Sequence, residues 1–197
     1  MIKNILVAAA IGVAGFGAQA NEISNGGFES NNVGSEYCYG CTATGWSAPL
    51  LITSGSVAWG VPSATAGSFQ LGNFVAGIQN GQVLTSDFTF VAGHTYSLTW
   101  DDAGRSGYTA QTYTVSAGGV TFADFGTSAG QAWGEHTETF TASSAADLQF
   151  AGHATVDSTT FIDNVSVMTT AVPEPTSLML MALGTLGLLA WRRRAQV

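Results

Sequence analysis

Alternation of large apolar and small polar residues runs through the middle of the chain. A period of two residues is typical of a β-strand with one buried face. Glycine-rich turns separate the alternating segments, and no amphipathic helical pattern occurs among them. Many short strands joined by such turns predict an all-β fold, an antiparallel β-sandwich. The alternating segments are 83–91, 94–100, 112–116, 119–125, 137–141, 148–151 and 161–167.

The first twenty residues follow a different pattern. Lys3 precedes a mostly apolar stretch at 5–16, and a small-x-small sequence follows at 18–20. A positive start, a short apolar run and a small-residue cleavage site are the three parts of a secretory signal peptide. We therefore expect residues 1–20 to be a signal-peptide helix and the mature chain to begin near Asn21.

The end of the chain also lacks alternation. Residues 177–191 are uncharged and mostly apolar on every helical face, and Arg192, Arg193 and Arg194 follow at once. A membrane span normally needs about 20 apolar residues, so this stretch is short. Basic residues directly after it are typical of the cytoplasmic end of a span. We predict a single transmembrane helix at 177–191 with a basic stop, either retained as an anchor or removed with a sorting signal.

A short motif precedes this predicted helix. Pro173, Glu174 and Pro175, followed by the apolar run and the basic tail, resemble the PEP-CTERM sorting signal of Gram-negative bacteria. The resemblance covers 172–197 and implies an exosortase-type processing enzyme as partner, with a transient stay in the inner membrane. It further implies a membrane-anchored precursor and a mature protein at the cell surface or in an extracellular biofilm matrix that contains exopolysaccharide.

Charge is sparse and unevenly distributed along the chain. Only 9% of the residues are charged, against roughly a quarter in ordinary globular proteins. Between residues 21 and 170, twelve Asp and Glu residues oppose the single Arg105, which gives a net charge of −11. This balance excludes nucleic acid as a partner, because binding phosphates requires clustered Lys and Arg. It also leaves one organic cation for all the buried carboxylates of this region.

The middle region carries a second resemblance. An Asn-Gly-Gly-Phe-Glu stretch that ends at Glu29, a Gly-Trp pair at 45–46 and a closing strand at 161–167 resemble the galactose-binding-like jelly roll of several carbohydrate-binding modules. The resemblance implies one jelly-roll β-sandwich over 21–171. It also implies a structural calcium ion that ties the first strand to the last through Glu29 and Asp163.

Apart from this resemblance, the alternation around Asp163 also makes it the most informative acidic residue. In an extended strand it shares a face with Phe161, Val165 and Val167, which predicts that its carboxylate is buried. A buried carboxylate needs a partner. The two available partners are Arg105 and a calcium ion, which prefers oxygen ligands. If Asp163 lay at a strand end instead, it would cap backbone N–H groups.

Cys38 and Cys41 are the only cysteines and form a C-x-x-C pair. In an exported chain such a pair favours a disulfide that closes a tight loop. A thioredoxin-like redox site would need a βαβ setting, which the surrounding sequence does not indicate. Zinc would need two further ligands, and the three histidines are scattered. We predict a structural disulfide ahead of redox activity, and redox activity ahead of zinc.

The stretch 101–107 follows a strongly alternating segment and is rich in charge. It contains Asp101, Asp102 and Arg105 together with two glycines. This composition predicts a surface turn in which Arg105 pairs with one of the two aspartates, a contact worth little when exposed. The alternative is a polar binding loop or part of an ion site, since loops often carry function.

The aromatic residues divide into two groups by their sequence context. Tyr96 and Trp100 alternate with polar residues, which predicts that they belong to the core. Four others lie in loop-like contexts and are expected to be exposed. Aromatic rings suit the apolar faces of pyranose sugars, so these four are candidate glycan contacts. They are Tyr37, Tyr39, Trp59 and Tyr108.

Catalysis has no comparable support in the sequence. The chain has no G-x-S-x-G elbow, no H-E-x-x-H and no phosphate-binding loop. We therefore expect a non-enzymatic, exported protein that binds or is embedded in extracellular polysaccharide. The alternatives are a structural surface protein without affinity for glycans and, less favoured, a glycan-active hydrolase, which would need two opposed carboxylates.

Overall fold

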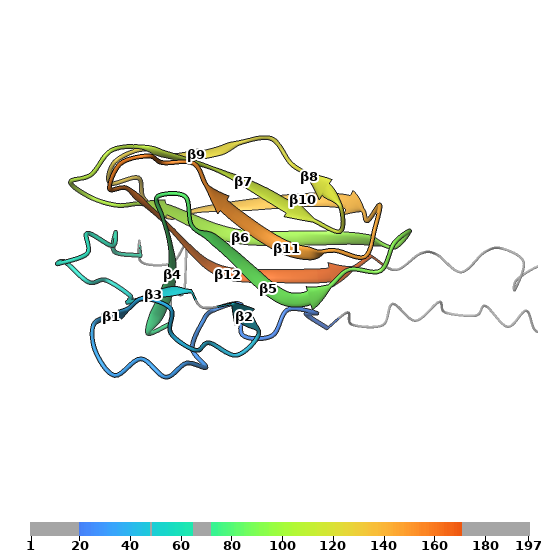
Figure 1. Ribbon diagram of the computed structural model, residues 1–197, viewed down its shortest axis with the longest axis horizontal. Coiled ribbons are helices and arrows are strands. Elements are labelled where there is room, and N and C mark those ends of the chain that lie inside the picture. The colour runs from blue at the N-terminus through green and yellow to red at the C-terminus, as the bar shows by residue number, and fades with distance from the viewer. Residues whose placement is uncertain (1–19, 48, 65–71, 171–197) are drawn as a thin grey trace, which may run out of the picture.

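The computed structural model describes residues 20–47, 49–64 and 72–170. Over these ranges the chain forms twelve β-strands and no helix, arranged as two antiparallel sheets that face each other (Figure 1). The predicted all-β sandwich is confirmed. None of the residues that the structure describes belongs to a helix able to span a membrane. The predicted signal helix and the predicted span at 177–191 lie outside the described residues.

Each sheet contains six strands, and all neighbouring strands are antiparallel. In spatial order, the first sheet consists of β1 (Tyr37–Cys38), β3 (Leu50–Thr53), β4 (Phe74–Gln79), β12 (Thr159–Thr169), β6 (Thr95–Gly104) and β10 (Gly134–Thr141). The second sheet consists of β2 (Trp46–Ser47), β5 (Val83–Thr89), β11 (Asp147–Gly152), β7 (Gln111–Ala117) and β8 (Val120–Thr121), with β9 (Phe125–Thr127) also paired to β7.

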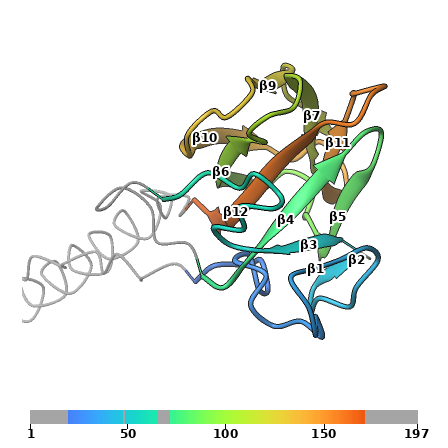
Figure 2. The same ribbon diagram turned by 90° about the vertical axis from the view of Figure 1, so that its left-hand side faces the viewer.

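The hydrophobic side chains form two separate clusters. The larger lies between the sheets and includes Trp100 and Tyr96, as their alternation predicts. The smaller lies on the outer face of the first sheet, where the segment after β3 covers β3, β4, β6 and β12 (Figure 2). Both faces of β3 are therefore buried, which removes the alternation that would have identified this strand in the sequence. The smaller cluster consists of Leu50, Ile52, Trp59, Val61, Val75, Ala103, Trp133 and Phe161.

A β-bulge divides β12 into two halves that face opposite ways. The pairing with β6 is interrupted between Asp163 and Ser166, and Asn164 there has a positive φ of 50°, which Asn tolerates better than most residues. An extra residue in a strand reverses the faces of all that follow. Phe161 accordingly packs in the outer cluster, whereas Val165 packs between the sheets. The expectation that Asp163 shares a face with Val165 and Val167 is wrong for this reason.

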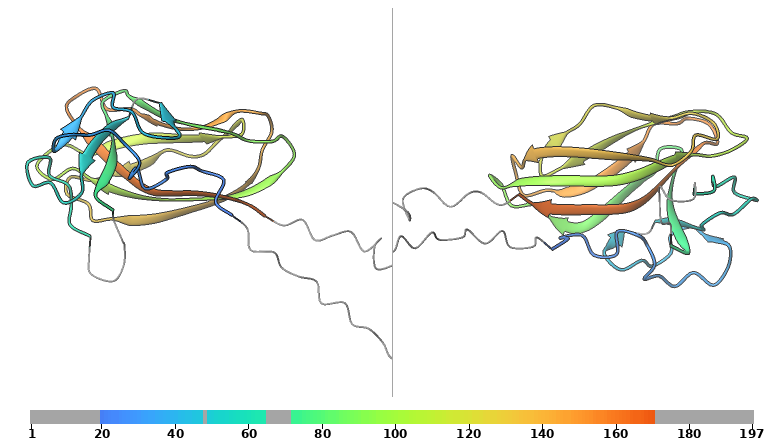
Figure 3. Two further views of the ribbon diagram at one scale, coloured as in Figure 1. Left: turned by 90° about the horizontal axis from the view of Figure 1, so that it is seen from below. Right: turned by 180° about the vertical axis from the view of Figure 1, so that it is seen from behind.

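The beginning of the described chain runs beside the second half of β12 (Figure 3). Glu22 N donates to Val167 O at 2.8 Å, and Val165 N donates to Gly26 O at 3.0 Å. Position 26 requires glycine, because a Cβ there would lie 1.8 Å from the Val165 carbonyl oxygen. The sequence elements of the second resemblance, far apart in the chain, are thus adjacent in the fold.

Strand β6 is longer than its alternation predicts. It continues through Asp101 and Asp102 to Gly104, because both aspartates pair with Glu135 and Gly134 of β10. Both are buried in the sheet, so the predicted turn at 101–107 is wrong in its first half. The turn begins only at Arg105.

Candidate functional site

The four predicted glycan contacts meet at one end of the sandwich, although they come from three separate segments. The ring centroids of Tyr37 and Trp59 are 5.0 Å apart, and those of Tyr39 and Trp59 are 6.0 Å apart. Tyr37 and Tyr39 meet edge to face at 6.1 Å. Tyr108 joins them through a shared cation, Arg105. We call these five residues the aromatic cluster.

Arg105 is the centre of the aromatic cluster. Its guanidinium carbon lies 4.4 Å from the ring centroid of Trp59 and 3.6 Å from that of Tyr108. Its Nε also donates to the Trp59 carbonyl oxygen at 3.0 Å. An arginine is well suited to this position, because its planar cation stacks on aromatic faces. At 6% exposed it is fixed between the two rings, not free on a turn.

The ion-pair partner of Arg105 is Asp157. Nη1 lies 3.3 Å from Asp157 Oδ1, and the Asp157 side chain is 57% exposed. The predicted pairing with Asp101 or Asp102 is wrong, because both lie within β6 and have other partners. Asp101 accepts from Asn164 Nδ2, and Asp102 accepts from the Tyr113 hydroxyl. Asp163 likewise does not use Arg105, so that alternative for its buried carboxylate is also wrong.

The exposure of the cluster differs between its members. Tyr37, Tyr39 and Tyr108 are 46%, 50% and 36% exposed, as expected for ligand contacts. Trp59 is only 8% exposed, so the expectation that it is exposed is wrong. The two tyrosines and Arg105 pack over its indole ring, which makes Trp59 the floor beneath an exposed tyrosine surface.

Polar groups border the exposed tyrosines. The Tyr39 hydroxyl donates to Gln79 Oε1 at 2.6 Å, and Gln79 Nε2 donates to Asp157 Oδ1 at 2.7 Å. An amide, a carboxylate and a phenol therefore lie beside the rings, as a ligand with both apolar faces and hydroxyl groups would require. The end of β4 supplies Gln79, which the sequence analysis missed because a single glutamine in a strand has no distinguishing pattern.

Cys38 and Cys41 are joined by a disulfide with a Cα–Cα separation of 5.7 Å. This confirms the predicted bridge. It closes the short loop in which Tyr39 lies, directly after the pairing of β1 with β3. The bridge therefore restrains the loop that carries Tyr39 of the aromatic cluster.

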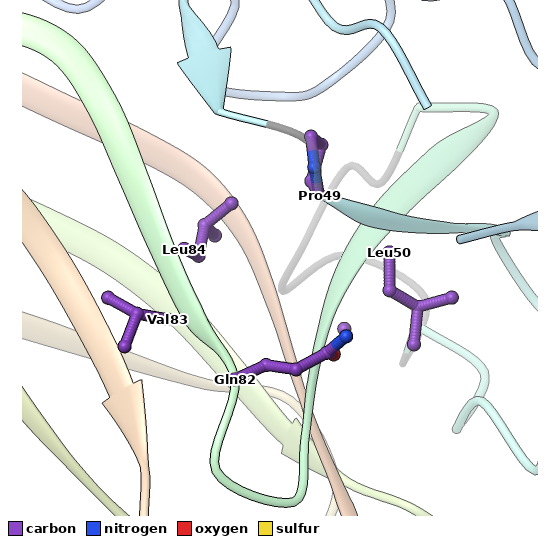
Figure 4. A pocket seen from close by; sticks show the side chains of 6 residues that line it. Pro49, Leu50, Gln82, Val83 and Leu84 are labelled. Atoms are coloured by element: carbon purple, nitrogen blue, oxygen red, sulfur yellow. The ribbon is translucent and has the colours of Figure 1, made fainter. Parts of the chain in front are cut away.

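A small hollow lies close to this polar border. It is bounded by the β4–β5 turn and the adjoining parts of β3 and β5 (Figure 4). Gln82, from the turn, accepts a hydrogen bond from Gln79 N at 3.3 Å. The hollow thus adjoins the network of Tyr39, but it contains none of the predicted glycan contacts. Its lining residues are Pro49, Leu50, Gly77, Gln82, Val83 and Leu84.

Asp163, the predicted calcium ligand, is fully buried on the outer face of the first sheet. Its Oδ1 accepts a hydrogen bond from Asn164 N at 2.8 Å, whereas its Oδ2 has no partner among the described residues. Burial raises the pKa of Asp163 to about 8, and the charges of Asp101 and Glu29 act in the same direction. An unpartnered, buried carboxylate oxygen fits a hard cation such as calcium.

Glu29, the other predicted ligand, lies near enough to influence Asp163 but already holds a neighbouring segment. Its Oε1 accepts from Phe74 N at 2.9 Å and its Oε2 accepts from Asn73 Nδ2 at 3.1 Å. Within the described ranges, no group of three or more acidic, His or Cys side chains is placed to hold a metal. Further ligands to an ion at Asp163 would therefore have to be backbone or amide oxygens, which calcium also accepts.

A second buried polar network was missed by the sequence analysis. Asp102, on the inner face of the first sheet, accepts from the Tyr113 hydroxyl at 2.8 Å, and Tyr113 in turn accepts from Trp100 Nε1 at 2.9 Å. His136 Nε2 lies 3.1 Å from Asp102 Oδ2, an ionic contact without hydrogen-bond alignment. The regular alternation of 137–141, extended backward, would have placed His136 facing inward.

Residues 171–194 match the family model of the PEP-CTERM protein-sorting motif. The chain therefore carries a PEP-CTERM sorting motif at its C-terminal end. Such a motif implies a secreted protein with a C-terminal, membrane-anchoring sorting signal. Its predicted Pro-Glu-Pro sequence and the three arginines fall within the matched range, outside the described residues. No curated protein matches the chain.

Several solved structures are similar to the sandwich. The CBM22-1 xylan-binding domain of Xyn10C from Paenibacillus barcinonensis is 13% identical with a TM-score of 0.46, over 79% of this chain and 98% of that one. TmCBM61, solved with β-1,4-galactotriose, is 14% identical with a TM-score of 0.45 over 77% and 99%. The K3 adhesin domain of Lys-gingipain from Porphyromonas gingivalis is 14% identical with a TM-score of 0.49 over 77% and 99%. Such distant likeness concerns the fold alone.

Proposed function

We propose that this protein is a non-enzymatic, exported protein that binds extracellular polysaccharide through the aromatic cluster. The observation that carries the proposal is an aromatic surface bordered by polar groups. Exposed Tyr37 and Tyr39 pack over the buried Trp59, exposed Tyr108 stacks on Arg105, and Gln79 and Asp157 lie at the border. Tyrosine rings present apolar surface at low cost in conformational entropy. They can therefore pack against the C–H faces of a sugar, while the amide and carboxylate bind its hydroxyl groups.

The charge around the cluster favours a neutral glycan. Arg105 is buried, and Asp157 offsets its charge at 3.3 Å. The rest of the body has no further cation and is strongly acidic, so an anionic chain would be repelled. We therefore expect neutral polysaccharides to bind in preference to polysaccharides rich in uronic acids.

The position of the cluster suits a protein held at a membrane by its C-terminal end. Asp157 lies just before β12, and Thr170 lies just after it. At roughly 3.3 Å per residue, the eleven residues of β12 span about 36 Å. Asp157, at the border of the aromatic cluster, and Thr170 thus lie at opposite ends of β12, and Figure 1 shows β1 far from the C-terminal end of β12. A ligand could approach the cluster while the chain remains anchored.

The sorting motif extends the proposal to processing and location. An exosortase-type enzyme would act on the chain at the inner membrane, and the mature form would reside at the cell surface or in the matrix. We further propose that a structural calcium ion, held by Asp163 and Glu29, ties the first turn of the body to β12. Its support is the buried, unpartnered Oδ2 of Asp163.

Affinity electrophoresis of the full-length chain tests the proposed function. Gels would contain xylan, β-1,4-galactan or exopolysaccharide from the producing bacterium. We expect retardation by at least one neutral polysaccharide, and loss of most of it in Tyr39→Ala. Val83→Ala is the matched control, since Val83 is a similarly exposed apolar residue on the second sheet.

The outcomes separate the three functions considered. Retardation that Tyr39→Ala leaves unchanged would place binding elsewhere. No retardation by any polysaccharide would favour a purely structural surface protein. Release of shorter sugars from the polysaccharide during incubation would favour the glycan-active hydrolase.

A further inference from the structure

The disulfide joins the aromatic cluster to the main core, because it flanks Tyr39 and because Cys41 packs in that core. Cys38 follows Tyr37 directly, and Tyr39 is inside the loop that the bridge closes. Tyr39 contacts Tyr37 and Trp59 with its ring and Gln79 with its hydroxyl. The residue that links the aromatic surface to its polar border is thus the residue that the bridge restrains most.

Little else restrains the backbone at this point. Strand β1 has only two paired residues, Tyr37 opposite Ile52 and Cys38 opposite Leu51. Beyond Cys38 the ladder ends, and Gly40 turns the chain with a positive φ of 64°. In the described part of the chain, no backbone hydrogen bond joins 39–41 to another segment. A covalent bridge is therefore the main local restraint on the position of Tyr39.

The two sulfur atoms differ in their access to a reductant. Cys41 is 7% exposed and packs with the core between the sheets, whereas Cys38 is half-buried. Thiol–disulfide exchange requires a thiolate to approach one sulfur directly. Attack is therefore expected at Cys38, with Cys41 as the leaving group.

We propose that the Cys38–Cys41 disulfide is a redox switch for the aromatic cluster. A dithiol reductant of the exported compartment attacks Cys38 Sγ; the Cys38–Cys41 bond breaks, and Cys41 Sγ leaves with the electron pair and takes up a proton. The second thiol of the reductant then displaces Cys38 as a thiol, which leaves the reductant oxidised and both cysteines reduced. Reduction frees Tyr39 from Trp59 and Gln79 and weakens the binding of polysaccharide. The proposal rests on the proposed function.

The fold itself does not depend on the bridge. A disulfide restricts the unfolded chain less when it closes a shorter loop, and this one joins residues only three positions apart. Cys41 is one member of the core between the sheets, and most of the other members come from β4 to β7 and from β10 to β12. Reduction should therefore act on the cluster and leave the sandwich intact.

Hydrogen exchange measured by mass spectrometry tests the switch without any ligand. The full-length chain is compared before and after reduction with dithiothreitol, and alkylation after labelling verifies that reduction is complete. We expect exchange of the hydrogen-bonded amides in 37–42 and 56–61, such as those of Thr42 and Val61, to accelerate on the order of tenfold or more, as for a segment released to local opening. Exchange in 95–103 of β6 should not change. The variant Cys38→Ser/Cys41→Ser should exchange rapidly in both conditions.

Affinity electrophoresis in the same two states tests the consequence for binding. We expect retardation by the polysaccharide that binds the oxidised chain to weaken on the order of tenfold, the effect of losing about 1.4 kcal/mol of contact. Unchanged exchange in 37–42 after full reduction would overturn the switch, whatever the binding result. Faster exchange in β6 as well would make the bridge a support of the fold and would also overturn it. Local acceleration without binding in either state would overturn the proposed function but not the control of the cluster by the bridge.

Discussion

Two aspartates on neighbouring strands of the first sheet are both fully buried, yet their surroundings are opposite. Asp102 of β6 faces the space between the sheets, and Asp163 of β12 faces the outer side. Asp102 has a histidine ring and two hydrogen-bond donors in contact: His136, Tyr113 and Gln131. Asp163 has one backbone donor and an oxygen without any partner in the described ranges.

The difference shows that two equally buried carboxylates can differ in how many partners compensate for their burial. Removing a carboxylate charge from water costs free energy at both positions. For Asp102 this cost is offset by groups from β7, from β10 and from the loop before β10. Contact with Asp102 raises the pKa of His136, and burial with the same contact raises the pKa of Tyr113, so the tyrosine stays a neutral donor. Nothing comparable offsets the cost at Asp163, where burial raises the pKa to about 8.

Removing Asp102 should have the largest effect of any single change to this pair. Asp102→Ala leaves His136, the Tyr113 hydroxyl and the Gln131 amide without their acceptor, and loss of a buried partner of this kind costs about 3–5 kcal/mol. Chemical denaturation would measure this decrease in the free energy of unfolding. Asp124→Ala, which removes an exposed aspartate bound only to Thr114 among the described residues, is the control and should change stability by less than about 0.5 kcal/mol. A loss below about 1 kcal/mol for Asp102→Ala would contradict this account of the network.

Calcium should give the buried carboxylate of Asp163 a partner, as Asp102 already has. If an ion occupies the site at Asp163, calcium at a hundredfold excess over its dissociation constant should stabilise the folded chain by about 3 kcal/mol. Thermal denaturation with millimolar calcium and with EDTA would show the shift. Asp163→Asn should abolish it, whereas Asp124→Asn should not. An identical melting temperature with and without calcium would remove the ion from the proposal.

Without calcium, neutralising Asp163 should stabilise the protein at high pH. Its pKa is raised from 3.8 to about 8 on folding, so its favourable contribution is complete below about pH 4 and is lost as the pH rises toward 8. Asp163→Asn lacks this loss and should be more stable than the parent by about 1–3 kcal/mol at pH 8 in EDTA. Denaturation at pH 4 is the internal control, since the gain should shrink there. A gain independent of pH would indicate a cause other than ionisation.

The smallest of these effects should come from His136. The pKa of His136 is raised chiefly by its close contact with the Asp102 carboxylate. Partial burial acts against this rise, and the charges of Asp101 and Glu138 add to it. A raised pKa means that the stabilisation is complete below the unfolded value near 6.5 and is lost as the pH rises through the folded value. His136→Gln should therefore cost about 1 kcal/mol or less at pH 5, and less again at pH 9. Denaturation across this range measures the difference, and a constant cost would contradict the ionic contribution.

Strands with one buried face were predictable from the sequence, and strands with two were not. The alternating segments fall on β5 to β8 and on β10 to β12, where burial alternates along all or part of each strand. Strands β3 and β4 were missed because the segment with Trp59 and Val61 buries their second face. The segment that buries this face follows β3 in the chain, and the local sequence pattern of β3 does not predict the contact.

The candidate site was predictable residue by residue but not as an arrangement. Loop context identified Tyr37, Tyr39 and Tyr108 as exposed, yet it gave no sign that they share one surface. It also misjudged Trp59, whose burial depends on two tyrosines and Arg105 folding over it. The local sequence predicts the solvent exposure of a segment. It does not predict the packing of one loop on another, because that is a long-range contact.

The sequence alone determined the sorting motif, the disulfide and the all-β character, since each depends on residues close together in the chain. Only the tertiary structure decided which residues meet. The β-bulge at the left-handed Asn164 turned Val165 toward the other sheet and left Asp163 on the outer face. The continuation of β6 withdrew Asp101 and Asp102 from Arg105, which left the only cation of the body to Asp157 and the aromatic rings. Both outcomes depend on strand pairing between distant segments, and the free energy of that pairing is not encoded at any one position.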